Sequence, residues 1–137
     1  TRYIGDWSSD VCSSDLTEWL KTIEKDACIV SGFQSKNESK LLDLLLKNNK
    51  NIIMVLSRKI YDKCPIKFEN AVKNGKMLII SPFDNMLKVT ARDNAKIRNQ
   101  FVLDTSDEIV VGDLSLGGML DGMLKGKTFK LLGEKLW

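Results

Sequence analysis

Small, hydroxyl-bearing and cationic residues follow successive short apolar segments of this 137-residue sequence. Ser31 and Gly32 follow the first segment, Arg58 and Lys59 follow the second, and Ser81 follows the third. Small residues let backbone N–H groups approach a phosphate, and arginine and lysine pair with its charge. This pattern indicates a binding site for an anionic, phosphate-bearing ligand. The candidate ligand-binding residues are Ser31, Gly32, Phe33, Ser35, Arg58, Lys59, Ser81, Pro82, Phe83, Arg92, Arg98, Asn99, Asp113, Gly117 and Gly118.

Simpler explanations exist for the same residues. A tight turn explains Gly32, a flexible loop explains Gly117-Gly118, and a solvated surface explains Arg58 and Lys59. The neighbouring Arg98 and Asn99 can reach a ligand, or they can brace the strand ends by hydrogen bonds to loop carbonyls. Each signal is weak alone, and their joint placement after successive apolar segments favours the binding site.

The composition limits the chemistry of such a site. The sequence has no histidine, and its three cysteines lack the spacing of metal ligands. We therefore expect no metal site, no cofactor and no Ser or Cys triad. Glu38, Asp93 and Asp113 are the carboxylates that could lie near the site and act as acid or base. The sequence favours a non-catalytic binding protein, with a nucleotide phosphoribohydrolase-type enzyme as an alternative.

The elements that must position these residues alternate between helix and strand. Each predicted strand is a short apolar run, which is typical of a parallel sheet covered on both faces. The predicted strands are Ala27–Val30, Asn51–Leu56, Lys76–Ile80, Glu108–Val111 and Thr128–Leu132. The predicted helices are Thr17–Lys25, Lys36–Asn48, Pro65–Gly75, Thr90–Thr105 and one that contains Leu120, Met123 and Leu124. The order predicts an α/β fold, a Rossmann-like three-layer sandwich with a mostly parallel sheet of four to six strands. Right-handed crossovers then place all carboxyl ends of the strands on one rim, where ligands bind in open α/β sheets.

Two helices carry explicit core predictions. The second helix repeats leucines at helical spacing, so this stripe is expected in the core. The last helix offers a longer apolar set for its core side. The leucines are Leu41, Leu42, Leu45 and Leu46, and the later set is Ala91, Ala95, Ile97, Phe101 and Val102.

Residues 1–16 differ from the rest in composition. They are rich in serine and carry one arginine against three aspartates, a net charge of −2. Because the whole chain has a net charge of +3, the remaining residues carry +5. The segment resembles translated sequencing-adapter sequence. We expect residues 1–16 to be a non-native or disordered N-terminal segment and residues 17–137 to form one domain, with a natural, poorly structured tail as the alternative. The sequence shows no secretory signal and no apolar run of roughly 18 residues, which predicts a cytoplasmic protein without membrane contact.

Five segments carry a family likeness: IVSGF (29–33), IIMVLSR (52–58), LIISPF (78–83), KIRNQFVLDTSDEIVVG (96–112) and SLGGML (115–120). Together they resemble the SLOG superfamily, and within it the Rossmann-like domain of DNA-processing protein A (DprA, Smf) in its short, free-standing form. Family members usually carry one more strand before the first helix, which ends in a loop that contacts the ligand. The adapter-like segment occupies that position here, so one wall of the pocket is expected to be missing or replaced.

The resemblance implies binding of a nucleotide-derived small ligand, such as a cyclic ADP-ribose-type or cyclic-nucleotide immune signal of antiphage defence. The protein would act as a sensor or as a phage-type sequestering protein. The related phosphoribohydrolase motif is absent, which argues against hydrolysis. DprA-like single-stranded DNA binding is the alternative, and SLOG-type domains are similar in forming homo-oligomers through their helices. For DNA, the stacking aromatics would be Phe33, Tyr61 and Phe83, and the groove lysines would be Lys59, Lys63 and Lys67.

Overall fold

Helices and strands alternate along the chain in the computed structural model, which describes residues 2–5, 13–34, 36–83, 91–111, 123 and 130–131. The elements are β1 (Arg2–Gly5), α1 (Ser13–Thr22), β2 (Cys28–Ser31), α2 (Lys36–Lys47), β3 (Asn51–Val55), α3 (Ile66–Lys73), β4 (Met77–Ile80), α4 (Ala91–Thr105), β5 (Glu108–Val111) and β6 (Lys130–Leu131). The predicted α/β class is therefore confirmed. None of the helices in these described ranges is long and apolar enough to cross a membrane.

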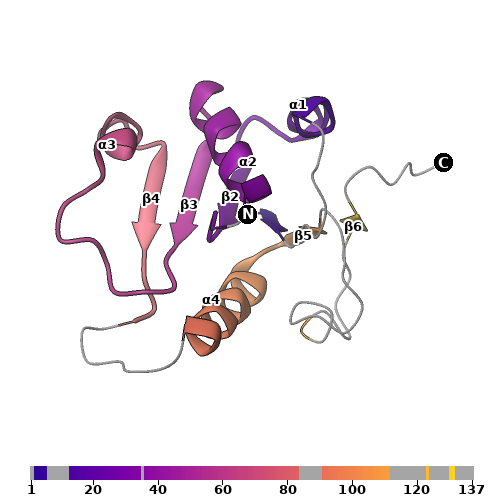
Figure 1. The fold of residues 1–137 in the computed structure, drawn as a ribbon. Helices are drawn as coiled ribbons and strands as arrows, with labels where there is room; N and C mark the ends of the chain where they lie inside the picture. The colour runs from indigo at the N-terminus through magenta and orange to yellow at the C-terminus, as the bar shows by residue number, and fades with distance from the viewer. Residues whose placement is uncertain are drawn as a thin grey trace.

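The described strands form one sheet in the order β4-β3-β2-β1-β5-β6. Every neighbouring pair is parallel. From β1 in the interior of the sheet, the chain moves outward through β2 and β3 to β4, and α4 carries it back to β5 on the other side of β1 (Figure 1). The strand order thus reverses between β1 and β5, and in open α/β sheets such a reversal opens a crevice at the carboxyl ends.

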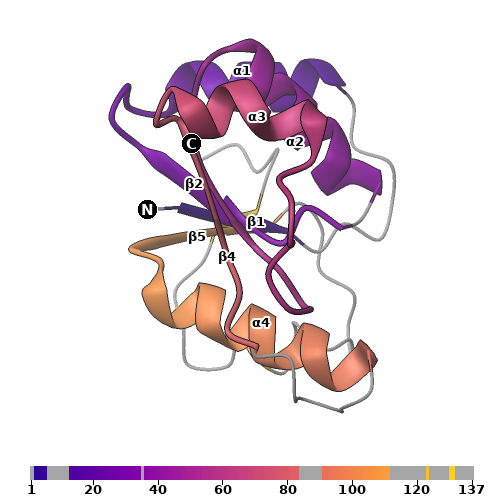
Figure 2. The same ribbon diagram turned by 90° about the vertical axis from the view of Figure 1, so that its left-hand side faces the viewer.

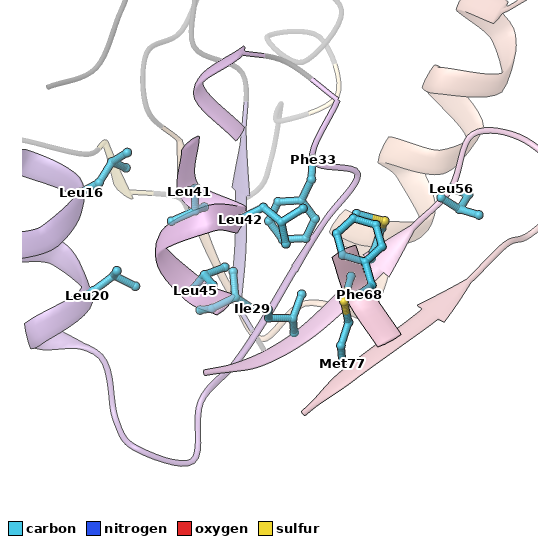
Figure 3. Packing of buried hydrophobic residues seen from close by; sticks show 12 residues of the cluster. Leu16, Leu20, Ile29, Phe33, Leu41, Leu42, Leu45, Leu56, Phe68 and Met77 are labelled. Carbon is cyan, nitrogen blue, oxygen red and sulfur yellow. The ribbon is translucent and has the colours of Figure 1, made fainter. Parts of the chain in front are cut away.

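The helices cover the two faces of the sheet unequally. Figure 2 shows α1, α2 and α3 on one side of the sheet and α4 on the other. The main hydrophobic cluster lies under the three helices and includes the leucine stripe of α2, as predicted (Figure 3). Its members are Leu16, Leu20, Ile29, Phe33, Leu41, Leu42, Leu45, Ile52, Met54, Leu56, Phe68 and Met77.

The N-terminal segment contributes the strand β1 and the first residues of α1 to the described structure. Arg2–Gly5 forms β1, which pairs with both β2 and β5. Helix α1 begins at Ser13 rather than Thr17, and Leu16 is fully buried. Leu16 and Leu20 are four residues apart, so they extend one apolar stripe across the boundary that the sequence analysis had drawn.

Helix α4 turns a different face to the sheet than its apolar residues predict. Ile97 and Phe101 are 45% and 37% exposed, so their placement in the core was wrong. Val102 is buried as predicted, and Arg98 and Leu103, which were not in the predicted core set, are buried as well. Arg98 and Val102 lie at i and i+4, on the stripe next to that of Ile97 and Phe101. The sheet-facing stripe of α4 therefore carries a buried arginine.

Candidate ligand-binding rim

The loops that follow β2, β3 and β4 lie at one edge of the sheet and are hydrogen-bonded to one another. Gln34 Nε2 donates to Ser57 Oγ at 2.8 Å, which joins the loop after β2 to the loop after β3. The Ser81 hydroxyl donates to the carbonyl of Arg58, which joins the loop after β4 to the same middle loop. The sequence-predicted residues after these three strands are thus brought together on one rim.

The loops after β2 and β4 share a Ser-x-Phe turn. The backbone N–H of Phe33 donates to Ser31 Oγ at 3.2 Å, and that of Phe83 donates to Ser81 Oγ at 3.1 Å. A serine that accepts from the backbone two residues later is a common way to stabilise a loop. The two hydroxyls predicted to face a ligand therefore also hold their own loops.

A buried guanidinium lies against Gly32. Arg98 is 6% exposed and donates from Nε to Asn99 Oδ1 at 2.7 Å. A methyl group on Gly32 would overlap Nη1 and Cζ of Arg98 and would lie 2.9 Å from Nε. Glycine at this position is thus what allows the arginine of α4 to pack on the end of β2. The finding favours the bracing role of Arg98 over a freely reaching one.

A buried carboxylate lies on the other side of the same loop. Glu38, in the first turn of α2, is buried and accepts a hydrogen bond from Ser31 Oγ at 2.8 Å. A guanidinium and a carboxylate therefore contact consecutive residues, Gly32 and Ser31. Buried charges need such polar contacts, since an uncompensated charge in the interior is strongly unfavourable. Asp93, the other described candidate acid, is exposed.

Arg58 presents positive charge at the exposed part of the rim. Its guanidinium carbon lies 4.9 Å from the centroid of the Tyr61 ring, and its Nε donates to the Lys59 carbonyl at 3.3 Å. Stacking on an aromatic face restrains a guanidinium through cation–π attraction. The adjacent Lys59 ammonium lies 3.7 Å from the Asp62 carboxylate. Arg58 is thus an oriented cation, while the charge of Lys59 is partly compensated.

The aromatic residues of the rim are mostly not available for stacking. Phe33 is 6% exposed and Phe83 is 8% exposed, and Phe33 belongs to the hydrophobic core. Phe33 adopts a left-handed conformation with φ of 51°, which turns the chain sharply after Gly32. Tyr61, with Arg58 over its ring, is the partly exposed aromatic of this group.

Some predicted site residues lie outside the described part of the chain. They are Ser35, Asp113, Gly117 and Gly118, and of Arg92 only the backbone is described, within α4. Gln34 and Ser57 lie in the same strand-end segments as the predicted residues, although neither was among the candidate ligand-binding residues. Their position was the signal that could have found them.

Two of the three thiols lie in the described part of the chain. Cys28 and Cys64 are free and half-buried, as expected of cysteines without a metal or disulfide role, and Cys12 lies outside the described residues. Burial raises the pKa of the Cys28 thiol. Within the described ranges, no group of three or more potential ligands could hold a metal ion.

Comparisons of this chain with protein-family models, with curated proteins and with solved structures find no match.

Proposed function

We propose that this protein binds a nucleotide-derived anionic ligand without chemistry, at the carboxyl-end rim of a Rossmann-like three-layer sandwich. The observation that carries the proposal is the packing of the Arg98 guanidinium on Gly32, one strand away from the reversal of strand order between β1 and β5. An arginine held in this way places fixed positive charge near the crevice where open α/β sheets bind ligands.

The shape of the rim supports a small ligand. Interloop hydrogen bonds through Ser57 and Ser81 restrain the loops, and restrained loops lose less conformational entropy when a ligand binds. Arg58 adds an exposed guanidinium whose geometry suits bidentate contact with a phosphate. The resemblance to the DprA-like branch of the SLOG superfamily agrees with this ligand class. Sensing and sequestration of an immune nucleotide are the two roles it favours.

Catalysis is less well supported by the described carboxylates. Glu38 is buried and engaged with Ser31, whereas Asp93 lies exposed on α4. A general acid or base must reach the proton it transfers, and the Glu38 carboxylate is buried and already engaged with Ser31. We therefore place binding ahead of the phosphoribohydrolase alternative.

Single-stranded DNA binding is a second candidate, because the exposed Arg58 and the partly buried Tyr61 form a cationic and aromatic pair at the rim. Single-strand binders combine such aromatics with a basic groove. Of the three aromatic residues predicted to stack on bases, Phe33 and Phe83 are buried, so Tyr61 alone remains. A single aromatic residue weakens the DNA-binding candidate.

Titration calorimetry tests the proposal with cyclic ADP-ribose isomers, cyclic dinucleotides and an oligo-dT strand. We expect saturable binding of one small compound, and at least a tenfold loss of affinity in Arg58→Gln, equivalent to about 1.4 kcal/mol. The matched control is Lys25→Gln, which removes one charge from an exposed side chain just before β2, at the opposite edge of the sheet from the rim. Binding of oligo-dT alone, weakening steeply with salt, would favour the DNA candidate. Absence of heat with every compound would refute both.

A further inference from the structure

A polar pocket of about 200 Å³ lies between α2 and α3, at the amino ends of β3 and β4 and thus at the opposite edge of the sheet from the rim. Lys67, Asn70 and Asn74 line it from one side of α3, spaced at i, i+3 and i+7. Leu46 and Ala71 supply its apolar part.

Two helix ends of the same kind shape this pocket. After α2, Asn49 takes a left-handed φ of 52°, and the N–H of Lys50 donates to the Leu45 carbonyl at 3.0 Å. After α3, Gly75 takes a φ of 73°, and the N–H of Lys76 donates to a carbonyl of α3 at 2.9 Å. Both are Schellman-type ends, in which backbone N–H groups satisfy the last helical carbonyls. The repeat places a lysine at the start of each of two neighbouring strands.

The charge of the pocket is positive. Lys50, Lys67 and Lys76 all line it, and no carboxylate does. Lys67 has a counterion, since its Nζ lies 2.7 Å from Asp43 Oδ1. Neither Lys50 nor Lys76 has an ion-pair partner among the residues that the structure describes. Each helix C-terminus contributes about half a negative charge. The two helix ends and the Asp43 carboxylate therefore supply about two negative charges, which is less than the positive charge of the three ammonium groups.

We propose that this pocket binds a phosphate group. Ammonium groups and the N–H₂ groups of three asparagine side chains are suitable donors for phosphate oxygens. The volume lies below the roughly 300 Å³ at which ligand pockets usually begin, so the pocket accommodates a phosphate-sized anion rather than a whole nucleotide. The phosphate can be free, or it can belong to a nucleic-acid backbone that crosses the two helices. Its position at the opposite edge of the sheet makes this site independent of the rim.

The test is an NMR titration of the full chain with sodium phosphate and, separately, with an oligo-dT strand at the same ionic strength. We expect phosphate to shift the amide signals of Lys50, Asn74 and Lys76, with a Kd on the order of 1 mM, as suits contacts that remain solvent-exposed. The double variant Lys50→Gln/Lys76→Gln should weaken binding at least roughly tenfold. The matched control Lys25→Gln/Lys96→Gln removes the same charge from exposed lysines that do not line the pocket, and it should change the Kd less than about twofold.

The two ligands distinguish the source of the phosphate. Tighter binding of oligo-dT at these amides, with loss in the double variant, identifies a nucleic-acid backbone. Binding of phosphate but not of oligo-dT identifies a free or small-molecule phosphate. The proposal is overturned if neither ligand shifts these amides, or if the control variant weakens binding as much as the pocket variant does. None of these outcomes depends on whether the rim binds a nucleotide.

Discussion

Replacing Gly32 with alanine tests the contact between β2 and α4. The added methyl group would overlap the guanidinium of Arg98, which must then leave its buried position. Gly32 does not have a positive φ, so the backbone itself accepts alanine. The main cost is the hydrogen bond from Arg98 to Asn99, and a hydrogen bond to a charged group contributes about 1.5–3 kcal/mol. We expect a loss of about 2 kcal/mol, or roughly 8 °C in Tm at about 4 °C per kcal/mol for a domain of this size.

A double-mutant cycle followed by urea unfolding isolates this contact. Arg98→Ala removes the atoms that the methyl group would meet, so Gly32→Ala should cost less than about 0.5 kcal/mol in that background. The matched control is Gly75→Ala, where φ is 73° and no atom lies within 4 Å of the added methyl group. Its cost, about 1 kcal/mol of backbone strain, should be equal in both backgrounds. Equal costs of Gly32→Ala with and without Arg98 would refute the reasoning.

Three further predictions follow from the described contacts. Ser31→Ala removes the hydroxyl that donates to the buried Glu38 carboxylate and should lower the free energy of unfolding in urea by about 2 kcal/mol. Ser57→Ala should lower it by less than about 0.5 kcal/mol, because its partner Gln34 is exposed. Equal losses in the two variants would contradict this. Because burial raises the pKa of Cys28, its thiol should react with iodoacetamide more slowly than free cysteine at pH 8. The contribution of this thiol to the free energy of unfolding should be constant below pH 9.0, its ordinary pKa, and should fall as the pH rises through the raised pKa. Light scattering should show the homo-oligomer that the sequence resemblance implies, and a monomer at every concentration would contradict it.

The sequence predicted much of the architecture because its signals were local and redundant. Short apolar runs identified β2, β3, β4 and β5 within one or two residues, and the leucine stripe identified the core face of α2. Gly75 was expected to end the third helix, and its φ of 73° confirms this. A glycine or a run of apolar residues carries its structural meaning within a few positions, so no tertiary information was needed.

The orientation of α4 could not be predicted in this way. Two adjacent stripes of this helix compete for the sheet, one with Ile97 and Phe101 and one with Arg98 and Val102. Hydrophobicity alone favours the first. The structure places the second against the sheet, because Gly32 leaves room there for a guanidinium. That decision depends on a residue 66 positions away in the sequence, which no pattern within the helix encodes.

The residue types at the rim were predicted better than the contacts that these residues make within the fold. The residues after β2, β3 and β4 do lie together, but Ser31 and Ser81 hold their own loops and Phe33 is part of the core. Residue types show which groups can bind a ligand. They do not show which of those groups are already engaged within the fold, because that depends on turn geometry.

The location of nucleotide binding tests the central claim most directly. In an NMR titration with cyclic ADP-ribose isomers and cyclic dinucleotides, we expect one compound to shift the amide signals of residues 31–34, 57–59 and 98–99 together. Signals from the pocket between α2 and α3 should shift only at higher ligand concentrations, near the Kd on the order of 1 mM expected for phosphate there. If no compound shifts the signals from these loops, or if the shifts occur only at the opposite edge of the sheet, the rim is not the binding site.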